Sequence, residues 1–198
     1  MIKAIIFDIG GVVYLGGMKS HLILQKKLKL NSKEWKKLNK LSFRKSWAKG
    51  KKVEEGLSIA AKIIRIKKSK LKKIWEEILR EDFKLNTELL KIINNLRKNY
   101  KTAILSNQWK LTYKVLINKN ITKHFDVSVF SHLEGAKKPE KKIYLIALKK
   151  LKLKPEECVF IDDQKVTLNP ARKLGMKTIQ FRNNNQLLRD LRKLNIRV

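Results

Sequence analysis

Apolar residues recur along this chain with two different periods, and each period marks a different kind of element. Short apolar runs rich in β-branched residues are typical of buried strands. The first run follows Lys3 and ends at Asp8, Gly10 and Gly11, and further runs are found at 102–106, 127–130, 158–161 and 178–181. The sequence therefore predicts five strands in the parts of the chain that carry these runs.

Between the runs, apolar residues are three and four positions apart, as on one face of a helix. This spacing predicts helices at 87–99 and 111–119, and another that Pro139 opens at its first position. Asn169 and Pro170 are interpreted as the N-cap and first turn of a further helix, which Gly175 ends. Strands that alternate with helices imply an α/β fold whose parallel sheet is covered on both faces.

One long stretch interrupts the alternation after Leu15-Gly16-Gly17, which we interpret as a hinge. No strand pattern is found there, and helical spacing is clearest at Leu71, Ile74, Trp75, Ile78 and Leu79, with further short helices indicated by Leu22, Leu24, Leu28, Leu30, Trp35, Leu38, Leu41 and Trp47. We predict a core formed by 1–15 and 85–198, with a helical subdomain inserted at 16–84. The tryptophans of this segment are expected in its core.

Composition narrows the class of protein. A chain of 198 residues that is 43% hydrophobic can bury a core of its own. It has no apolar stretch long enough to span a bilayer, and it begins with a strand pattern where a signal peptide would place a basic segment and a long apolar run, so we expect a cytoplasmic protein without a membrane segment. Cys158 is the only cysteine and is expected to be a buried strand thiol.

The net charge of +31 would attract nucleic acids, anionic lipids or phosphorylated small molecules at low salt. The basic residues are mostly lysines spread over the whole length between apolar residues, which is typical of solvated helix faces. No recognisable nucleic-acid reader motif is present. Non-specific nucleic-acid binding therefore stays an alternative, and the oligomeric state stays open.

Polar residues follow the strand patterns where each strand is expected to end. Because the carboxyl ends of parallel strands meet along one edge of a sheet, these residues should converge. They are Asp8, Ser106, Asn107, Lys138, Asp162 and Asp163. Each alone is at least as well explained as a turn residue or a solvated lysine, but their order along the chain favours a shared site.

Such a set of residues is suited to phosphoryl transfer on a small phosphorylated substrate. Asp8 could attack phosphorus, and Ser106 and Asn107 could donate hydrogen bonds to the phosphoryl oxygens. Lys138 could neutralise their charge, and Asp163 with Asp8 could hold Mg²⁺. The sequence thus predicts a catalytic Asp8 and Lys138, with phosphate bound by Ser106, Asn107 and Lys138.

This arrangement resembles the haloacid dehalogenase superfamily over nearly the whole chain. The four motifs of that family correspond here to Phe7-Asp8-Ile9-Gly10-Gly11-Val12, Leu105-Ser106-Asn107, Lys137-Lys138-Pro139-Glu140 and Phe160-Ile161-Asp162-Asp163. The chain is most similar to the branch that includes the phosphatase-type N-terminal domain of soluble epoxide hydrolase. The resemblance implies a Rossmann-like core with a helical cap, to whose W-x-x-G segment we match Trp47-Ala48-Lys49-Gly50-Lys51 with Glu54-Glu55.

The resemblance also implies metal ligands and one departure from the family pattern. Mg²⁺ would be held by Asp8, the backbone carbonyl of Gly10, Asp163 directly and Asp162 through water. Family phosphatases usually carry a second Asp, which acts as general acid and base, at the position of Gly10. Its loss should lower activity on poor leaving groups by roughly 10²–10⁴-fold.

Two other functions remain open from the sequence. The dehalogenase branch also lacks the second Asp, but it does not typically carry the acid pair found here at Asp162-Asp163, which therefore favours Mg²⁺ and phosphate. The second alternative is a catalytically weak member of the family whose basic surface binds polyanions.

Overall fold

The core of the protein is a five-stranded parallel sheet with the strand order β5-β4-β1-β6-β7. The computed structural model describes residues 1–16, 20–40, 53–108, 110–117 and 119–198. The strands are β1 (Ala4–Phe7), β4 (Lys101–Ser106), β5 (Val127–Phe130), β6 (Cys158–Asp162) and β7 (Lys177–Gln180). The predicted α/β fold with a parallel sheet is confirmed. Because β1 lies at the centre, its carboxyl end is flanked by those of β4 and β6.

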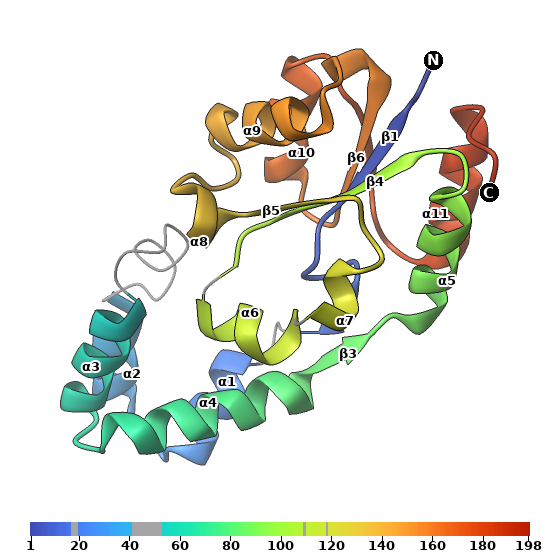
Figure 1. Ribbon diagram of the computed structural model, residues 1–198. Coiled ribbons are helices and arrows are strands. Elements are labelled where there is room, and N and C mark those ends of the chain that lie inside the picture. Colours follow the sequence, from blue (N-terminus) through green and yellow to red (C-terminus); the bar gives the residue numbers. More distant parts are fainter. Residues whose placement is uncertain (17–19, 41–52, 109, 118) are drawn as a thin grey trace.

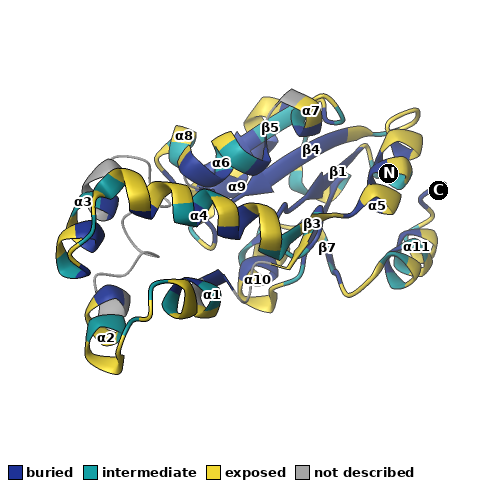
Figure 2. Ribbon diagram, turned by 90° about the horizontal axis from the view of Figure 1, so that it is seen from below, coloured by how far each residue is buried: buried dark blue, intermediate teal, exposed yellow. Residues whose placement is uncertain are grey.

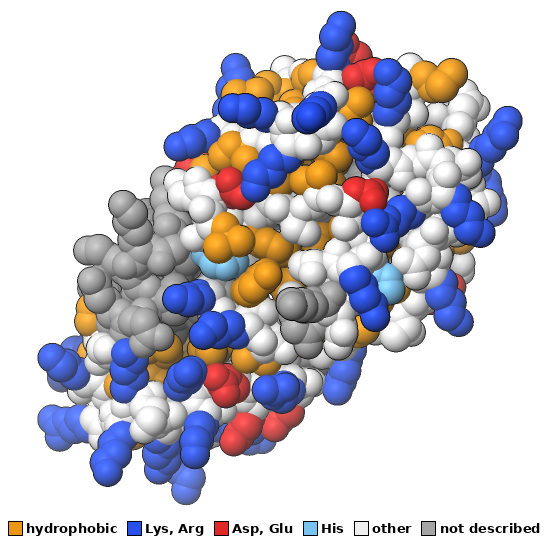
Figure 3. Space-filling view, in the orientation of Figure 1, with side chains coloured by type: hydrophobic (Ala, Val, Ile, Leu, Met, Phe, Trp, Pro, Cys, Tyr) orange, Lys and Arg blue, Asp and Glu red, His pale blue; other side chains and the backbone are white. Residues whose placement is uncertain are grey.

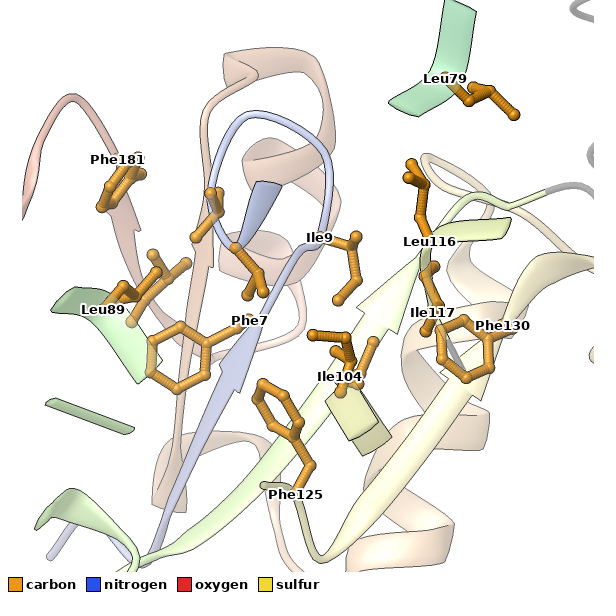
Figure 4. Packing of buried hydrophobic residues seen from close by; sticks show 14 of the residues in the cluster. Phe7, Ile9, Leu79, Leu89, Ile104, Leu116, Ile117, Phe125, Phe130 and Phe181 are labelled. Carbon is orange, nitrogen blue, oxygen red and sulfur yellow. The ribbon is translucent and has the colours of Figure 1, made fainter. Parts of the chain in front are cut away.

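Helices cover both faces of the sheet (Figure 1). On one face lie α9 (Lys141–Leu151) and α10 (Lys165–Lys173), and on the other α5 (Thr87–Leu96) and α11 (Asn184–Lys193). Successive side chains of a strand point to opposite faces of the sheet. Ile6 therefore packs on the side of α9 and α10, and Phe7 on the side of α5 and α11. Figure 4 shows Phe7 between Leu89 and Phe125, and the rings of Phe7 and Phe125 are 6.2 Å apart.

The inserted segment leaves and rejoins the core through two short strands that the sequence analysis missed. These strands, β2 (Tyr14–Gly16) and β3 (Phe83–Leu85), pair antiparallel. Leu15 and Gly16 of the predicted hinge belong to β2, while Gly17 lies outside the described residues, so the hinge stays a prediction. Three-residue strands are too short to show a period of two, which explains why the pattern did not reveal them.

Four helices lie between these strands, below the sheet in Figure 1. They are α1 (Ser20–Lys27), α2 (Ser32–Lys40), α3 (Val53–Ile63) and α4 (Lys68–Asp82). Helix α4 buries Leu71, Trp75, Ile78 and Leu79, as its spacing predicted. Trp35, which was expected in the core of this segment, is only partly buried. Leu22 lies on a helix, α1, as predicted, and is 54% exposed. Leu41, Trp47 and the rest of the W-x-x-G segment up to Lys51 lie outside the described residues.

Short helices complete the core. They are α6 (Lys110–Leu116), α7 (Lys119–Thr122), α8 (Ser131–Glu134) and the 3₁₀ helix η1 (Pro155–Glu157). Helix α4 packs against α6, so the inserted segment contacts the core beyond its two connecting strands. In Figure 2, β1 and β4 are coloured as buried, while the helices turn exposed residues outward. Within the described residues, no helix has the length and apolar composition needed to cross a membrane.

Two helix starts differ from those predicted. Pro139 lies in the turn before α9, which begins at Lys141. Pro170 lies inside α10, which begins at Lys165, so Asn169 is not an N-cap. Because Thr167 and Leu168 pack their side chains into the core, tertiary burial extends α10 in the N-terminal direction. Gly175 follows the helix with φ of 100°, as expected.

Candidate active site

The loop after β1 brings Asp8 to the carboxyl end of the sheet and folds tightly behind it. The Asp8 backbone N–H donates to the carbonyl of Ile161, 2.9 Å away, which extends the β1–β6 pairing by one residue. Gly11 has φ of 78°, and a Cβ at Gly11 would lie 2.6 Å from Cγ of Asp163. A glycine is therefore required at this position because the loop backbone passes directly against the Asp163 carboxylate.

Gly10 is different. A Cβ at Gly10 would have no neighbour within 4 Å, and its φ is not positive. A side chain could therefore be accommodated at Gly10, the position where family phosphatases usually carry the second Asp.

Asn107 holds the loop that carries Lys138. Its side-chain amide donates to the carbonyl of Lys138 at 2.9 Å, and its side-chain oxygen accepts from the Lys138 backbone N–H at 2.8 Å. These two hydrogen bonds join the end of β4 to the loop before α9. The predicted contact of Asn107 with a phosphoryl oxygen stays a prediction, while its contact with Lys138 was not foreseen.

The Lys138 ammonium lies between two carboxylates. Nζ is 2.9 Å from Oδ1 of Asp8 and 2.6 Å from Oδ2 of Asp162, and Lys138 is only 4% exposed. Burial lowers the pKa of Lys138, but Asp8 and Asp162 outweigh burial and raise the pKa above its usual value. Lys138 is therefore held as a buried cation beside the side chain that was expected to be the nucleophile.

The acid pair after β6 divides into two environments. Asp162 is fully buried, with Oδ2 against Lys138 and Oδ1 accepting from the Gln164 backbone N–H at 2.8 Å. Asp163 is half-buried, and its Oδ1 is buried without a hydrogen-bond partner. Burial, Asp8 and Asp162 raise the pKa of Asp163 to about 6. Both oxygens of Asp162 are thus engaged, whereas Asp163 retains a free acceptor.

Carboxylate oxygens of Asp8, Asp162 and Asp163 lie within 4.8 Å of one another. Burial raises the pKa of Asp8 in spite of the opposing charge of Lys138. Three carboxylates against one ammonium leave an excess of negative charge, and a hard divalent cation prefers such oxygen donors. The donor set and the free oxygen of Asp163 therefore fit Mg²⁺.

Ser106 ends β4 beside these groups and is part of a buried polar cluster. Its hydroxyl interacts with Asp8, an interaction that lowers the pKa of that carboxyl against the dominant effect of burial. Gln108 donates from Nε2 to Oγ of Ser106 at 3.0 Å, and its backbone N–H donates to Oγ of Ser131 at 3.0 Å. Sequence reasoning missed Gln108 and Ser131, and the only available signal was that both follow the ends of strands.

All six residues predicted to converge thus lie at one edge of the sheet. A family profile described as haloacid dehalogenase-like hydrolase matches residues 2–175.

The chain belongs to the haloacid dehalogenase-like hydrolase family. The predicted family is confirmed, and so is the predicted likeness to epoxide hydrolase. This hydrolase is 35% identical to bifunctional epoxide hydrolase 2 of Sus scrofa over 130 residues, which cover 63% of this chain and 23% of that relative. It therefore spans less than a quarter of the length of that relative.

Two other matches involve phosphate. The hydrolase is 28% identical over 135 residues to the phosphorylated carbohydrates phosphatase of Thermotoga maritima, which covers 63% of this chain and 62% of the relative. Its fold is similar to that of a haloacid dehalogenase family enzyme from Bacteroides thetaiotaomicron, solved as a complex with magnesium and inorganic phosphate. That likeness has a TM-score of 0.79 at 21% identity and covers 95% of this chain and 99% of the other.

Proposed function

We propose that this hydrolase is a Mg²⁺-dependent phosphatase that removes a phosphoryl group from a small phosphorylated metabolite. The observation that carries the proposal is the placement of Lys138 between Asp8 and Asp162 while Asp163 keeps an unpartnered oxygen. This arrangement offers a nucleophile, a buried cation and an open ligand position within one cluster. The phosphatase relative and the fold neighbour with magnesium and phosphate support the same chemistry.

In the proposed reaction, Asp8 attacks phosphorus and the ester P–O bond breaks, which releases the alcohol or phenol and leaves an aspartyl-phosphate. Water then cleaves that aspartyl-phosphate, which releases inorganic phosphate and restores the Asp8 carboxylate. Ser106 donates a hydrogen bond to a phosphoryl oxygen, and Lys138 offsets the negative charge that would otherwise repel the carboxylate of Asp8. Asp162 acts by holding Lys138 in place, through the 2.6 Å ion pair.

Mg²⁺ would be held by Asp8, Asp163 and the backbone carbonyl of Gly10, with Asp162 in contact through water. When bound, it would supply further positive charge for the phosphoryl oxygens. The structure supports Asp163 over Asp162 as the direct ligand, because both Asp162 oxygens already have partners.

The proposed site has no general acid at position 10 to protonate the leaving group. Gly10 has no side chain to donate a proton, so we infer that the enzyme favours leaving groups that depart as stable anions. The backbone at Gly10 has normal φ and free space, which makes the loss of the acid reversible by substitution.

We further propose that residues 16–84 act as a cap that selects the substrate, over a core formed by 1–15 and 85–198. The paired strands β2 and β3 connect the two parts, and α4 packs on α6. A cap in this position can exclude bulk water and contact the part of the substrate beyond the phosphoryl group.

The basic surface does not by itself indicate a second function. On the face shown in Figure 3, Lys and Arg side chains are distributed over the core and the inserted segment alike. A nucleic-acid interface usually concentrates its charge along one element or groove. Polyanion binding is therefore an outcome to be distinguished by the test.

The test is hydrolysis of a panel of aryl and alkyl phosphates by the purified chain with Mg²⁺. We expect turnover that stops with chelator and returns with added Mg²⁺, and faster turnover of aryl than of alkyl esters. A protein that only binds polyanions would show no turnover, and its nucleic-acid binding would persist in chelator and weaken with salt. Turnover that is unaffected by chelator would contradict the proposed mechanism.

A further inference from the structure

The buried polar cluster behind the site contains a side chain that no step of the proposed reaction uses. Gln108 follows β4 by two residues and is 6% exposed. Its Nε2 donates to Oγ of Ser106 at 3.0 Å. A buried carboxamide is costly unless it is hydrogen-bonded, so this contact is a specific interaction of the site.

The backbone of Gln108 is held from the neighbouring strand. Its N–H donates to Oγ of Ser131 at 3.0 Å, and Oγ of Ser131 donates back to the Gln108 carbonyl at 3.2 Å. Ser131 follows β5 directly and is fully buried. The two hydrogen bonds therefore fix Gln108 between the ends of β4 and β5, and its side chain is presented to Ser106 from a rigid position.

The direction of the Gln108–Ser106 hydrogen bond decides what Ser106 can do. A serine hydroxyl has one proton to donate and can accept at its lone pairs. Because the Gln108 amide donates into Oγ, the Ser106 proton is not used in this contact. It is available to another acceptor, and the Asp8 carboxylate follows β1, the strand that pairs with β4 just before Ser106.

We propose that Gln108 is a positioning residue of the phosphatase site, which keeps the Ser106 hydroxyl as a donor toward Asp8 and toward the phosphoryl group that Asp8 attacks. The inference rests on the proposed function. Gln108 does not touch the substrate in this account and acts only through Ser106.

Two substitutions separate this role from simple packing. Gln108→Met keeps the length of the side chain and removes the donor, while Gln108→Glu replaces the donor with an acceptor that competes for the Ser106 proton. We expect kcat/KM for an aryl phosphate to fall by about 10-fold with Met and by about 100-fold with Glu, as for loss or reversal of an oriented donor. If Gln108 only fills space, Gln108→Met should leave kcat/KM nearly unchanged, and any difference between the Met and Glu variants should not depend on Ser106.

The decisive measurement is a double-mutant cycle. Both substitutions are repeated in Ser106→Ala, where a residue that acts through the Ser106 hydroxyl has nothing left to position. We expect Gln108→Met to change kcat/KM by less than about 2-fold in that background. The added charge of Gln108→Glu repels phosphate in either background, so only the part of its loss that acts through Ser106 should disappear. Gln186→Met and Gln186→Glu, on α11 and hydrogen-bonded to Asp190, serve as matched controls that should leave turnover unchanged.

The affinity for inorganic phosphate in the presence of Mg²⁺, measured by calorimetry, keeps this inference separate from the proposed function. If the wild type binds phosphate but does not turn over esters, the phosphatase proposal fails, and the same cycle in phosphate affinity still tests Gln108. If the full loss caused by Gln108→Met persists in Ser106→Ala, or if Gln108→Met equals the wild type, the positioning role is overturned. It is also overturned if Gln108→Met does not fold, or if the wild type neither binds phosphate nor turns over esters.

Discussion

The two ends of the five-stranded sheet both carry acidic side chains, and their surroundings shift the pKa values of those groups in opposite directions. At the carboxyl end, burial raises the pKa of Asp8, and burial together with neighbouring acids raises the pKa of Asp163 to about 6. At the amino end, Lys3 lowers the pKa of Glu157 across a 2.6 Å ion pair.

Asp126, just before β5, shows the same behaviour as Glu157. It accepts from the Thr102 backbone N–H at 2.8 Å and pairs with Arg97 at 2.8 Å. Burial raises the pKa of Asp126, but the Thr102 and Arg97 contacts outweigh burial and lower the pKa overall. Glu157 and Asp126 thus each have a partner for their charge.

The opposite pKa shifts separate acids that stabilise the fold from acids whose charge would be stabilised only by a bound cation. A carboxyl whose pKa falls on folding adds stability in its charged form, whereas one whose pKa rises costs stability in that form. At the carboxyl end, Asp8 and Asp163 carry this cost. Such perturbed groups are typical of functional sites.

Asp8→Asn should show the largest effect, because it removes the proposed nucleophile from the carboxyl end of the sheet. We expect Mg²⁺-dependent hydrolysis of an aryl phosphate to fall by at least about 10³-fold. The fold should persist, since the amide is nearly isosteric and relieves repulsion among the acids. Steady-state kinetics and a melting curve check both points, and comparable turnover in a contaminant-free variant would refute covalent catalysis by Asp8.

Alanine substitutions within the acid pair, Asp162 and Asp163, test which of the two acids is the direct metal ligand. Asp163→Ala should weaken Mg²⁺ activation by more than about 100-fold, and Asp162→Ala should weaken it less, because Asp162 acts mainly through Lys138. Mg²⁺ should raise the melting temperature of the wild type but not of Asp163→Ala. Equal thermal shifts in the wild type and Asp163→Ala would contradict the assignment of the direct ligand.

Gly10→Asp tests whether the carboxyl end lacks only a proton donor. We expect turnover of sugar phosphates to rise by roughly 10-fold or more, and turnover of aryl phosphates to change less, because an alkoxide needs a proton to leave. The gain should appear in kcat. Gly11→Ala is the matched control: its Cβ would lie against Asp163, so it should lose Mg²⁺ activation. A folded Gly10→Asp protein without any dependence on the leaving group would mean that another residue already supplies the proton.

At the amino end, Asp126→Asn should lower stability without loss of turnover. We expect a cost of about 1 kcal/mol at pH 7 for this partly exposed group. Since folding lowers the pKa of Asp126, the cost should be full above pH 4 and shrink as the pH falls below that value. Urea unfolding at pH 7 and pH 3 measures it, and the same cost at both pH values would assign the effect to something other than charge.

Asp163→Asn in chelator should change the free energy of unfolding with the opposite sign to Asp126→Asn. Folding raises the pKa of Asp163 from about 4 to about 6, so the wild type loses stability as the pH rises through this range and keeps the loss above it. We expect the variant to be more stable by roughly 1 kcal/mol at pH 7, since Asp163 is only half-buried, and equal to the wild type below pH 4. A variant that is less stable than the wild type at pH 7 would break the comparison between the two ends.

Much of this site could be predicted because it depends on topology. A buried strand that ends in an acid, and parallel strands that share an edge, were enough to bring Asp8, Ser106 and Asp163 together. Lys138 was found among many other lysines by its place in the loop before Pro139 and by the motif Lys137-Lys138-Pro139-Glu140. Gln108 and Ser131 were missed because their interaction crosses from β4 to β5, and nothing local to either residue signals such a contact.

The period of apolar residues by itself determined the fold class, the four ordered motifs indicated the family, and the order of polar residues along the chain indicated six residues of the site. The tertiary structure alone decided their electrostatic roles: that Asp162 is occupied by Lys138, that Asp163 is free, and that the Gln108 amide donates to Ser106. The physical reason is that strand patterns and topology follow from neighbours in the chain. Charge, burial and hydrogen-bond direction depend instead on atoms brought within a few ångströms from distant segments.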